Sequence, residues 1–131
     1  MSNEKGNFEA TFAALREVLA AYGERLQVTV DKPGDYQLSS RTLKDRTGRP
    51  LFVAAVQIKK NYVSYHLLPL YMNPALQKKV SPELKKRKQG KACFNFTEIA
   101  PEQIRDIAGL TGECIEAFKN PKLPWDKPKK R

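Results

Sequence analysis

The sequence is poor in the residues that hold metals and disulfide frameworks. Its 131 residues include two cysteines and one histidine. Two cysteines cannot form a disulfide framework, and together with one histidine they fall short of the four ligands of a tetrahedral zinc site. We therefore expect no metal site and no bound cofactor.

Long apolar segments are also absent. The longest stretch without a formal charge covers residues 61–77 and is interrupted by Pro69 and Pro74, whereas a transmembrane helix needs about 20 consecutive and mostly apolar residues. The first five residues include Glu4 where a secretory signal carries a basic and then an apolar run. These features predict a cytosolic protein without a membrane partner.

What the sequence does contain is enough apolar material for one core, since 40% of the residues are hydrophobic. Helical spacing at steps of three and four predicts a first helix over residues 8–22 and a last helix that begins at Pro101. The apolar face of the first helix consists of Phe8, Phe12, Leu15, Leu19 and Tyr22. The face of the last helix consists of Ile104, Ile107, Thr111, Ile115 and Phe118.

Between the two helices the pattern changes to the alternation that is typical of strands. Strands are predicted over residues 26–31, 36–43, 51–58, 62–67 and 91–97. The first four are joined by short links, which favours an antiparallel meander. Asn73-Pro74 and Ser81-Pro82 are cap-then-proline pairs that predict two short helices, the second of which ends at Gly90.

This order predicts a two-layer α+β fold. An antiparallel sheet of about five strands (α-β-β-β-β-α-β-α order) is covered on one face by the terminal helices. Residues 1–119 form the single domain, and residues 120–131 form a proline-rich basic tail without a core of its own.

Three blocks of sequence resemble the YdhG-like bacterial family of unknown function. They are residues 56–71 (VQIKKNYVSYHLLPLY), 81–87 (SPELKKR) and 89–96 (QGKACFNF). The resemblance implies an α+β fold of the same order. One branch of the family is described as an intracellular iron chaperone analogous to frataxin. Iron delivery of that kind uses clustered carboxylates. The acidic residues of this chain are instead dispersed along the sequence. We therefore expect the fold of the family here and not its iron-chaperone activity.

Strand alternation separates the sheet into an apolar face and a polar face. Val63, Tyr65 and Leu67 are predicted to face the helices together with Phe94 and Phe96. The opposite face would then carry Tyr62, Ser64, His66, Cys93, Asn95 and Thr97, joined by Gln27, Thr29, Gln37 and Ser39. This face is either simply solvated or a shallow binding surface. The observation in favour of a binding surface is that the face carries little lysine and glutamate, which a solvated face usually carries.

The basic side chains concentrate in one internal segment. Residues 76–91 carry seven basic side chains against Glu83 alone, while residues 1–50 carry eight basic and seven acidic ones. The run that includes Lys85, Lys86, Arg87, Lys88 and Lys91 is predicted to form a collar around a short helix. It either solubilises the protein or, with Lys59 and Lys60, binds a phosphorylated ligand or nucleic acid.

His66 and Cys93 also suggest a thiol-dependent enzyme, in which the imidazole would hold the thiolate. The sequence has no nucleophile elbow or glycine-rich oxyanion loop to support that chemistry.

The leading prediction is therefore a non-enzymatic domain that binds a small anionic molecule on the polar sheet face. Its predicted ligand-binding residues are Lys59, Lys60, Tyr62, Ser64, His66, Lys85, Lys86, Arg87, Lys88, Lys91, Cys93 and Asn95. The alternative is sequence-independent binding of nucleic acid through the basic segment and the tail.

Overall fold

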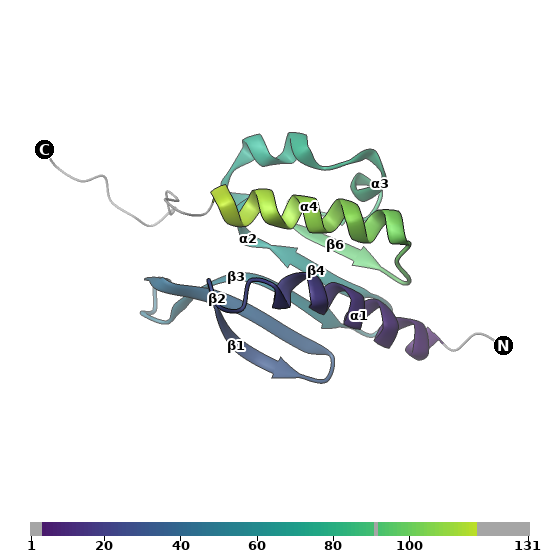
Figure 1. Ribbon diagram of the computed structural model, residues 1–131, viewed down its shortest axis with the longest axis horizontal. Coiled ribbons are helices and arrows are strands. Elements are labelled where there is room, and N and C mark those ends of the chain that lie inside the picture. The colour runs from purple at the N-terminus through teal and green to yellow at the C-terminus, as the bar shows by residue number, and fades with distance from the viewer. Residues whose placement is uncertain (1–3, 91, 118–131) are drawn as a thin grey trace, which may run out of the picture.

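The computed structural model describes residues 4–90 and 92–117 and shows an α+β fold (Figure 1). The helical elements are α1 (Glu4–Ala20), α2 (Leu68–Met72), the 3-10 helix η1 (Pro74–Lys79), α3 (Pro82–Lys85) and α4 (Pro101–Ala117). The strands are β1 (Gln27–Lys32), β2 (Asp35–Lys44), β3 (Pro50–Ile58), β4 (Val63–Leu67), β5 (Lys88–Gln89) and β6 (Cys93–Phe96). The predicted fold class is confirmed. Phe118 and the predicted tail lie outside the described residues.

All six strands form one antiparallel sheet in the order β1-β2-β3-β4-β6-β5. The first four strands follow one another as the predicted meander. Gly34 has a φ of +77° in the turn between β1 and β2, a conformation that glycine adopts without strain. The turn places the start of β2 beside the end of β3, where Ile58 donates its backbone N–H to the Gly34 carbonyl at 2.9 Å.

The core lies between the sheet and the two long helices, which cover the same face (Figure 1). The predicted face of α1 is buried from Phe8 to Leu19, and α4 buries Ile107, Leu110 and Ile115. Val63, Tyr65, Leu67, Phe94 and Phe96 on the facing strands are fully buried. In the described part of the chain no helix covers the opposite face of the sheet.

The prediction of a short helix that ends at Gly90 is wrong. α3 ends at Lys85, and Lys88 and Gln89 form the short strand β5, which pairs with β6. A second helical turn would have no apolar side chain to bury, because residues 85–88 are all basic, and helices depend on such burial for their stability. Gly90, with a φ of +72°, instead supports the turn that follows β5. The basic side chains therefore do not form a helical collar.

The sequence interpretation also missed the single turn of α2. It begins directly after β4 with Pro69 in its first turn, and it buries Pro69 and Leu70. Proline is well suited to the first turn of a helix because its missing N–H needs no partner there.

Candidate functional site

A shallow hollow of about 300 Å³ lies on the uncovered face of the sheet. Strands β2, β3, β4 and β6 and the segment between β3 and β4 supply its lining. The lining residues are Gln37, Phe52, Ala55, Gln57, Lys59, Tyr62, Ser64, His66 and Cys93.

Strand register explains why these side chains meet. His66 on β4 lies opposite Cys93 on β6 and opposite Ala55 on β3. Ser64 lies opposite Asn95 and Gln57 in the same two ladders. Residues directly opposite each other in a ladder share one face of the sheet. The grouping predicted from strand alternation therefore matches the observed register.

Five of the predicted site residues line the hollow, namely Lys59, Tyr62, Ser64, His66 and Cys93. Asn95 lies next to it and accepts a weak hydrogen bond from the Cys93 Sγ at 3.7 Å.

Of the four polar side chains predicted on the first two strands, Gln37 lines the hollow and the other three, Gln27, Thr29 and Ser39, form contacts elsewhere. The hydroxyls of Thr29 and Ser39 are 3.2 Å apart, and the Gln27 Nε2 donates to the Ser40 carbonyl at 2.8 Å. They lie outside the lining of the hollow, which is confined to the inner strands and the segment between β3 and β4.

The sequence interpretation missed three lining residues on β3, namely Phe52, Ala55 and Gln57. Apolar residues occupy both the odd and the even positions of this strand, so alternation does not show which side chains face outward. A register shift in the β2–β3 ladder decides the matter, since Leu38 lies opposite Ala54 whereas the next residue, Ser39, lies opposite Phe52. The shift turns Phe52 onto the uncovered face, where its ring centroid lies 5.3 Å from that of His66. Such a bulge has no signal in this sequence.

Asp35 fixes the orientation of two glutamine side chains in the hollow. Its Oδ1 accepts from the Gln37 Nε2 at 3.0 Å and from the Gln57 Nε2 at 3.1 Å. A carboxylate only accepts hydrogen bonds, so each amide must present its nitrogen to Asp35. The two amide oxygens are thereby directed away from Asp35 as acceptors. The hollow thus gains two oriented carbonyl groups.

Burial keeps the imidazole and the thiol of the hollow neutral. It lowers the pKa of His66 and raises the pKa of Cys93, the latter against smaller opposing effects of Lys59 and of a backbone hydrogen bond at Tyr65. The Cys93 thiol donates to Asn95. A thiolate held by an imidazolium would need the opposite shift of the cysteine pKa, so the pair lacks the electrostatics of an activated nucleophile.

The basic segment does not line this hollow. Lys88 lies opposite Phe94 in the β5–β6 ladder, which places it toward the helix-covered side, and its Nζ donates to the Gln77 Oε1 at 2.7 Å. Lys85 is exposed and lines neither hollow nor pocket among those described for this chain. Arg87 lines a separate pocket beside the start of α4.

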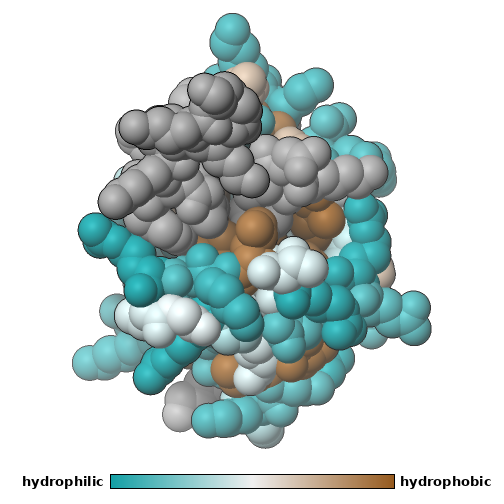
Figure 2. Space-filling model, turned by 90° about the vertical axis from the view of Figure 1, so that its left-hand side faces the viewer, coloured by the Kyte–Doolittle hydropathy of each residue, from teal (hydrophilic) through white to brown (hydrophobic). Residues whose placement is uncertain are grey.

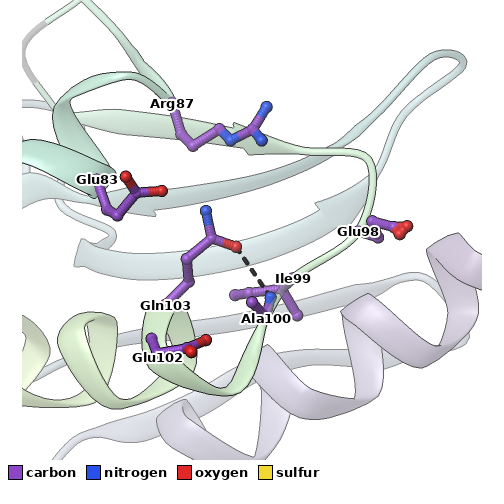
Figure 3. A pocket seen from close by; sticks show the side chains of 7 residues that line it. All are labelled: Glu83, Arg87, Glu98, Ile99, Ala100, Glu102 and Gln103. Atoms are coloured by element: carbon purple, nitrogen blue, oxygen red, sulfur yellow. Dashed lines mark hydrogen bonds between the residues drawn. The ribbon is translucent and has the colours of Figure 1, made fainter.

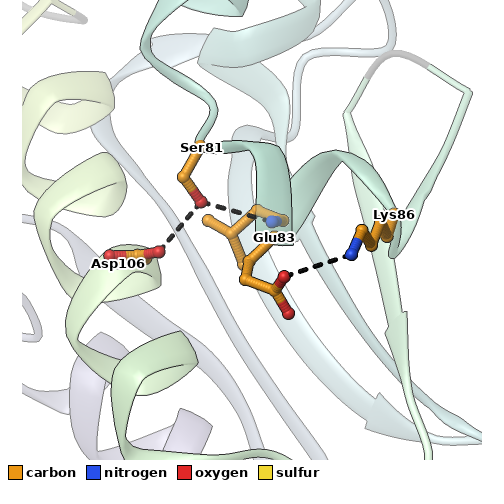
Figure 4. Close-up of polar contacts among 5 residues, drawn as sticks. Ser81, Glu83, Lys86 and Asp106 are labelled. Carbon is orange, nitrogen blue, oxygen red and sulfur yellow. Dashed lines mark hydrogen bonds and ion pairs between the residues drawn. The ribbon is translucent and has the colours of Figure 1, made fainter.

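Lys86 pairs with Glu83 on the same short segment, while Ser81 joins α3 to α4 (Figure 4). The Lys86 Nζ lies 3.3 Å from the Glu83 Oε1. Ser81 caps α3 by accepting the Leu84 N–H at 3.2 Å, and it donates to the Asp106 Oδ2 at 2.9 Å. The short helix that carries the first basic residues is thereby fastened to α4.

Lys60 and Lys91 complete the predicted set. Lys60 lines another cavity beside α1, together with Phe8, Glu9, Ile58 and Lys59, so Lys59 borders both this cavity and the hollow. Lys91 lies outside the described residues. Among the described residues, Lys59 is therefore the one charged side chain in the lining of the hollow.

The described ranges contain no group of three or more His, Cys, Asp or Glu side chains placed to hold a metal ion. None of the helices in these ranges has the length and apolar character needed to cross a membrane. Comparison of the chain with protein-family models, with curated proteins and with solved structures finds no match. Membership of the YdhG-like family therefore stays a prediction.

Proposed function

We propose that this protein binds a small anionic molecule in the hollow on its uncovered sheet face. The observation that carries the proposal is the single cation of Lys59 in a lining that is otherwise neutral, partly buried and rich in hydrogen-bonding groups. Lys59 itself is exposed, so it attracts an anion to the rim of the hollow, and the partly buried hydrogen-bonding groups beside it would hold the ligand there.

The size and charge of the hollow favour a monocarboxylate over a phosphorylated ligand. Its volume of about 300 Å³ lies at the lower end of the range of roughly 300–1,000 Å³ that is usual for ligand sites. One lysine balances one negative charge, whereas a phosphate ester carries up to two. The cations that would balance the second charge, at residues 85–88, lie elsewhere.

The remaining lining groups suggest what else the ligand carries. Tyr62 and Ser64 offer hydroxyl groups, and Gln37 and Gln57 offer amide oxygens. Phe52 and His66 offer tilted ring faces beside Ala55. A small carboxylate with a hydroxyl or amide group and a compact apolar part satisfies all three kinds of contact.

Nucleic-acid binding is the weaker alternative. A polyanion is bound by cations that follow one continuous groove. Here Lys88 donates to Gln77, Lys86 pairs with Glu83, and Arg87 lies in a pocket with three glutamates. Residual binding to nucleic acid would show a steep loss of affinity with rising salt.

The proposal keeps two further expectations from the sequence. One is a YdhG-like relationship, supported by the agreement between the implied and the observed element order. The other is a cytosolic location, supported by the two free thiols, Cys93 and Cys114, since thiols stay reduced in that compartment.

A thermal-shift screen tests the proposal. The probes are lactate, benzoate and mandelate, with a sugar phosphate and a nucleoside monophosphate for comparison. We expect at least one of the carboxylates to raise the melting temperature through linkage between binding and folding. The increase should vanish in Lys59→Gln and persist in Lys60→Gln, a matched lysine that does not line the hollow. A flat screen, or equal loss in both variants, contradicts the proposal.

A further inference from the structure

A second pocket, of about 550 Å³, lies between the α3–β5 segment and the start of α4 (Figure 3). It shares no residue with the hollow on the uncovered sheet face. Its lining consists of Glu83, Arg87, Glu98, Ile99, Ala100, Glu102 and Gln103. Glu98 and Glu102 are close in the sequence, and the fold brings Glu83 beside them.

Gln103 presents an accessible amide donor to this pocket. The residue is only 6% exposed, and its Oε1 accepts the Ala100 backbone N–H at 2.9 Å. This contact is one half of a capping box. Because the backbone N–H can only donate, the side-chain oxygen must face it. The Gln103 Nε2 is thereby turned toward Glu83 and Arg87 (Figure 3), and it has no hydrogen-bond partner among the described residues.

A second donor group belongs to the same lining. The Arg87 guanidinium lines the same pocket and forms no ion pair within the described part of the chain. A planar carboxylate is the group that a guanidinium and a neighbouring amide donor bind best.

The glutamates make a simple anion a poor ligand. Glu83 is already paired with Lys86 at 3.3 Å, which leaves Arg87 against Glu98 and Glu102. One positive charge and two negative charges give a balance of −1 for these three lining groups. A complementary ligand therefore carries one carboxylate and two cationic groups.

We propose that this pocket binds a free basic α-amino acid, such as arginine or lysine. Its carboxylate would lie against Arg87 and the Gln103 Nε2. Its α-ammonium and its side-chain cation would lie against Glu98 and Glu102, with Ile99 beside the aliphatic part. The α-carboxylate and α-ammonium distinguish this ligand from a polyamine and from a basic side chain within a peptide.

Calorimetric titration of the full chain with L-arginine and L-lysine tests the proposal. Saturable binding in the millimolar range or tighter is expected. Agmatine, which lacks the carboxylate, and Nα-acetylarginine, which lacks the α-ammonium, should each bind at least about ten-fold more weakly, because each leaves a charged partner without its counterpart. Absence of saturable binding overturns the proposal. Equal affinity for agmatine also overturns it, because the carboxylate would then have no role.

Matched variants locate the binding. Gln103→Glu keeps the acceptor for the Ala100 N–H and removes the donor, so it should retain stability and lose affinity by about ten-fold or more. Arg87→Gln should weaken binding while Lys85→Gln, outside the pocket, leaves it unchanged. Glu102→Gln should also weaken it, whereas Glu113→Gln, exposed farther along α4, should not. Equal effects of the pocket variants and their controls refute the assignment.

Discussion

The hydroxyl of Thr111 joins α4 to the strand that lines the hollow, and its removal should destabilise the fold. The Thr111 Oγ1 donates to the Ile107 carbonyl at 2.7 Å and lies 2.6 Å from the Tyr65 hydroxyl. A threonine hydroxyl has one hydrogen. Since that hydrogen goes to Ile107, Tyr65 must be the donor in the second bond. Both Tyr65 and Thr111 are fully buried.

The substitution Thr111→Val preserves the shape of the side chain and leaves the Tyr65 O–H without an acceptor. A buried donor without a partner costs about 1–3 kcal/mol. Valine and threonine have similar helix propensities, so the helix itself contributes little to the change. Tyr65→Phe removes the donor instead and leaves the bond from Thr111 to Ile107 intact, so it should cost only about 1 kcal/mol.

The double variant tests whether the cost of Thr111→Val comes from the unpaired Tyr65 hydroxyl or from a simple loss of contacts. With Tyr65→Phe added to Thr111→Val no buried donor remains unpaired, so the double variant should be more stable than Thr111→Val alone. Urea denaturation followed by circular dichroism measures the free energies of unfolding. Additive destabilisation in the double variant would refute the assignment of Tyr65 as the donor. Because Tyr65 lies between Ser64 and His66 on β4, the same bond fixes the strand beneath the hollow.

Three further predictions concern single side chains. Cys93 should alkylate more slowly than a free cysteine at neutral pH because burial raises its pKa, and Cys114, which is buried with its pKa raised to about 12, should be slower still in single-cysteine variants. Burial lowers the pKa of His66 from 6.5, so the unfolded chain binds that proton first as the pH falls. The free energy of unfolding should therefore decrease as the pH drops below 6.5, and less so in His66→Gln, as urea titrations at several pH values can show. Ser81→Ala removes the cap of α3 and the bond to Asp106, and should cost about 1–2 kcal/mol in the same assay.

Local patterns predicted most of the fold. The spacing of Phe8, Phe12, Leu15 and Leu19 predicted α1, and the short links between the first four strands predicted the meander. Both patterns are set by neighbouring residues along the chain. The element that failed was the helix expected up to Gly90. Whether residues 88–89 form a helix or a strand depends on whether β6 lies beside them as a pairing partner. The local sequence does not show this.

The candidate site was only partly predictable. Alternation along β4 and β6 placed Ser64, His66 and Cys93 together, because side chains alternate strictly in a regular strand. Phe52 and Gln57 depend on a register shift and on contacts with Asp35, which arise between strands rather than within one.

The pocket between the α3–β5 segment and the start of α4 could not be predicted from the sequence either. Glu83 on α3 and Glu98 in the segment between β6 and α4 line one pocket only after the chain has folded. The total charge of +10 likewise did not reveal that the basic segment lies away from the hollow.

Chemical-shift mapping by NMR tests the central claim most directly. Lactate, benzoate and mandelate would each be titrated into the 15N-labelled protein, its Lys59→Gln variant and its Lys60→Gln variant. The proposed site predicts shifts confined to the lining of the hollow on β2, β3, β4, β6 and the segment between β3 and β4. These shifts should be lost in Lys59→Gln and retained in Lys60→Gln. Shifts centred instead on residues 85–88, or no saturable shifts with any of the three carboxylates, would contradict the binding site proposed for this protein.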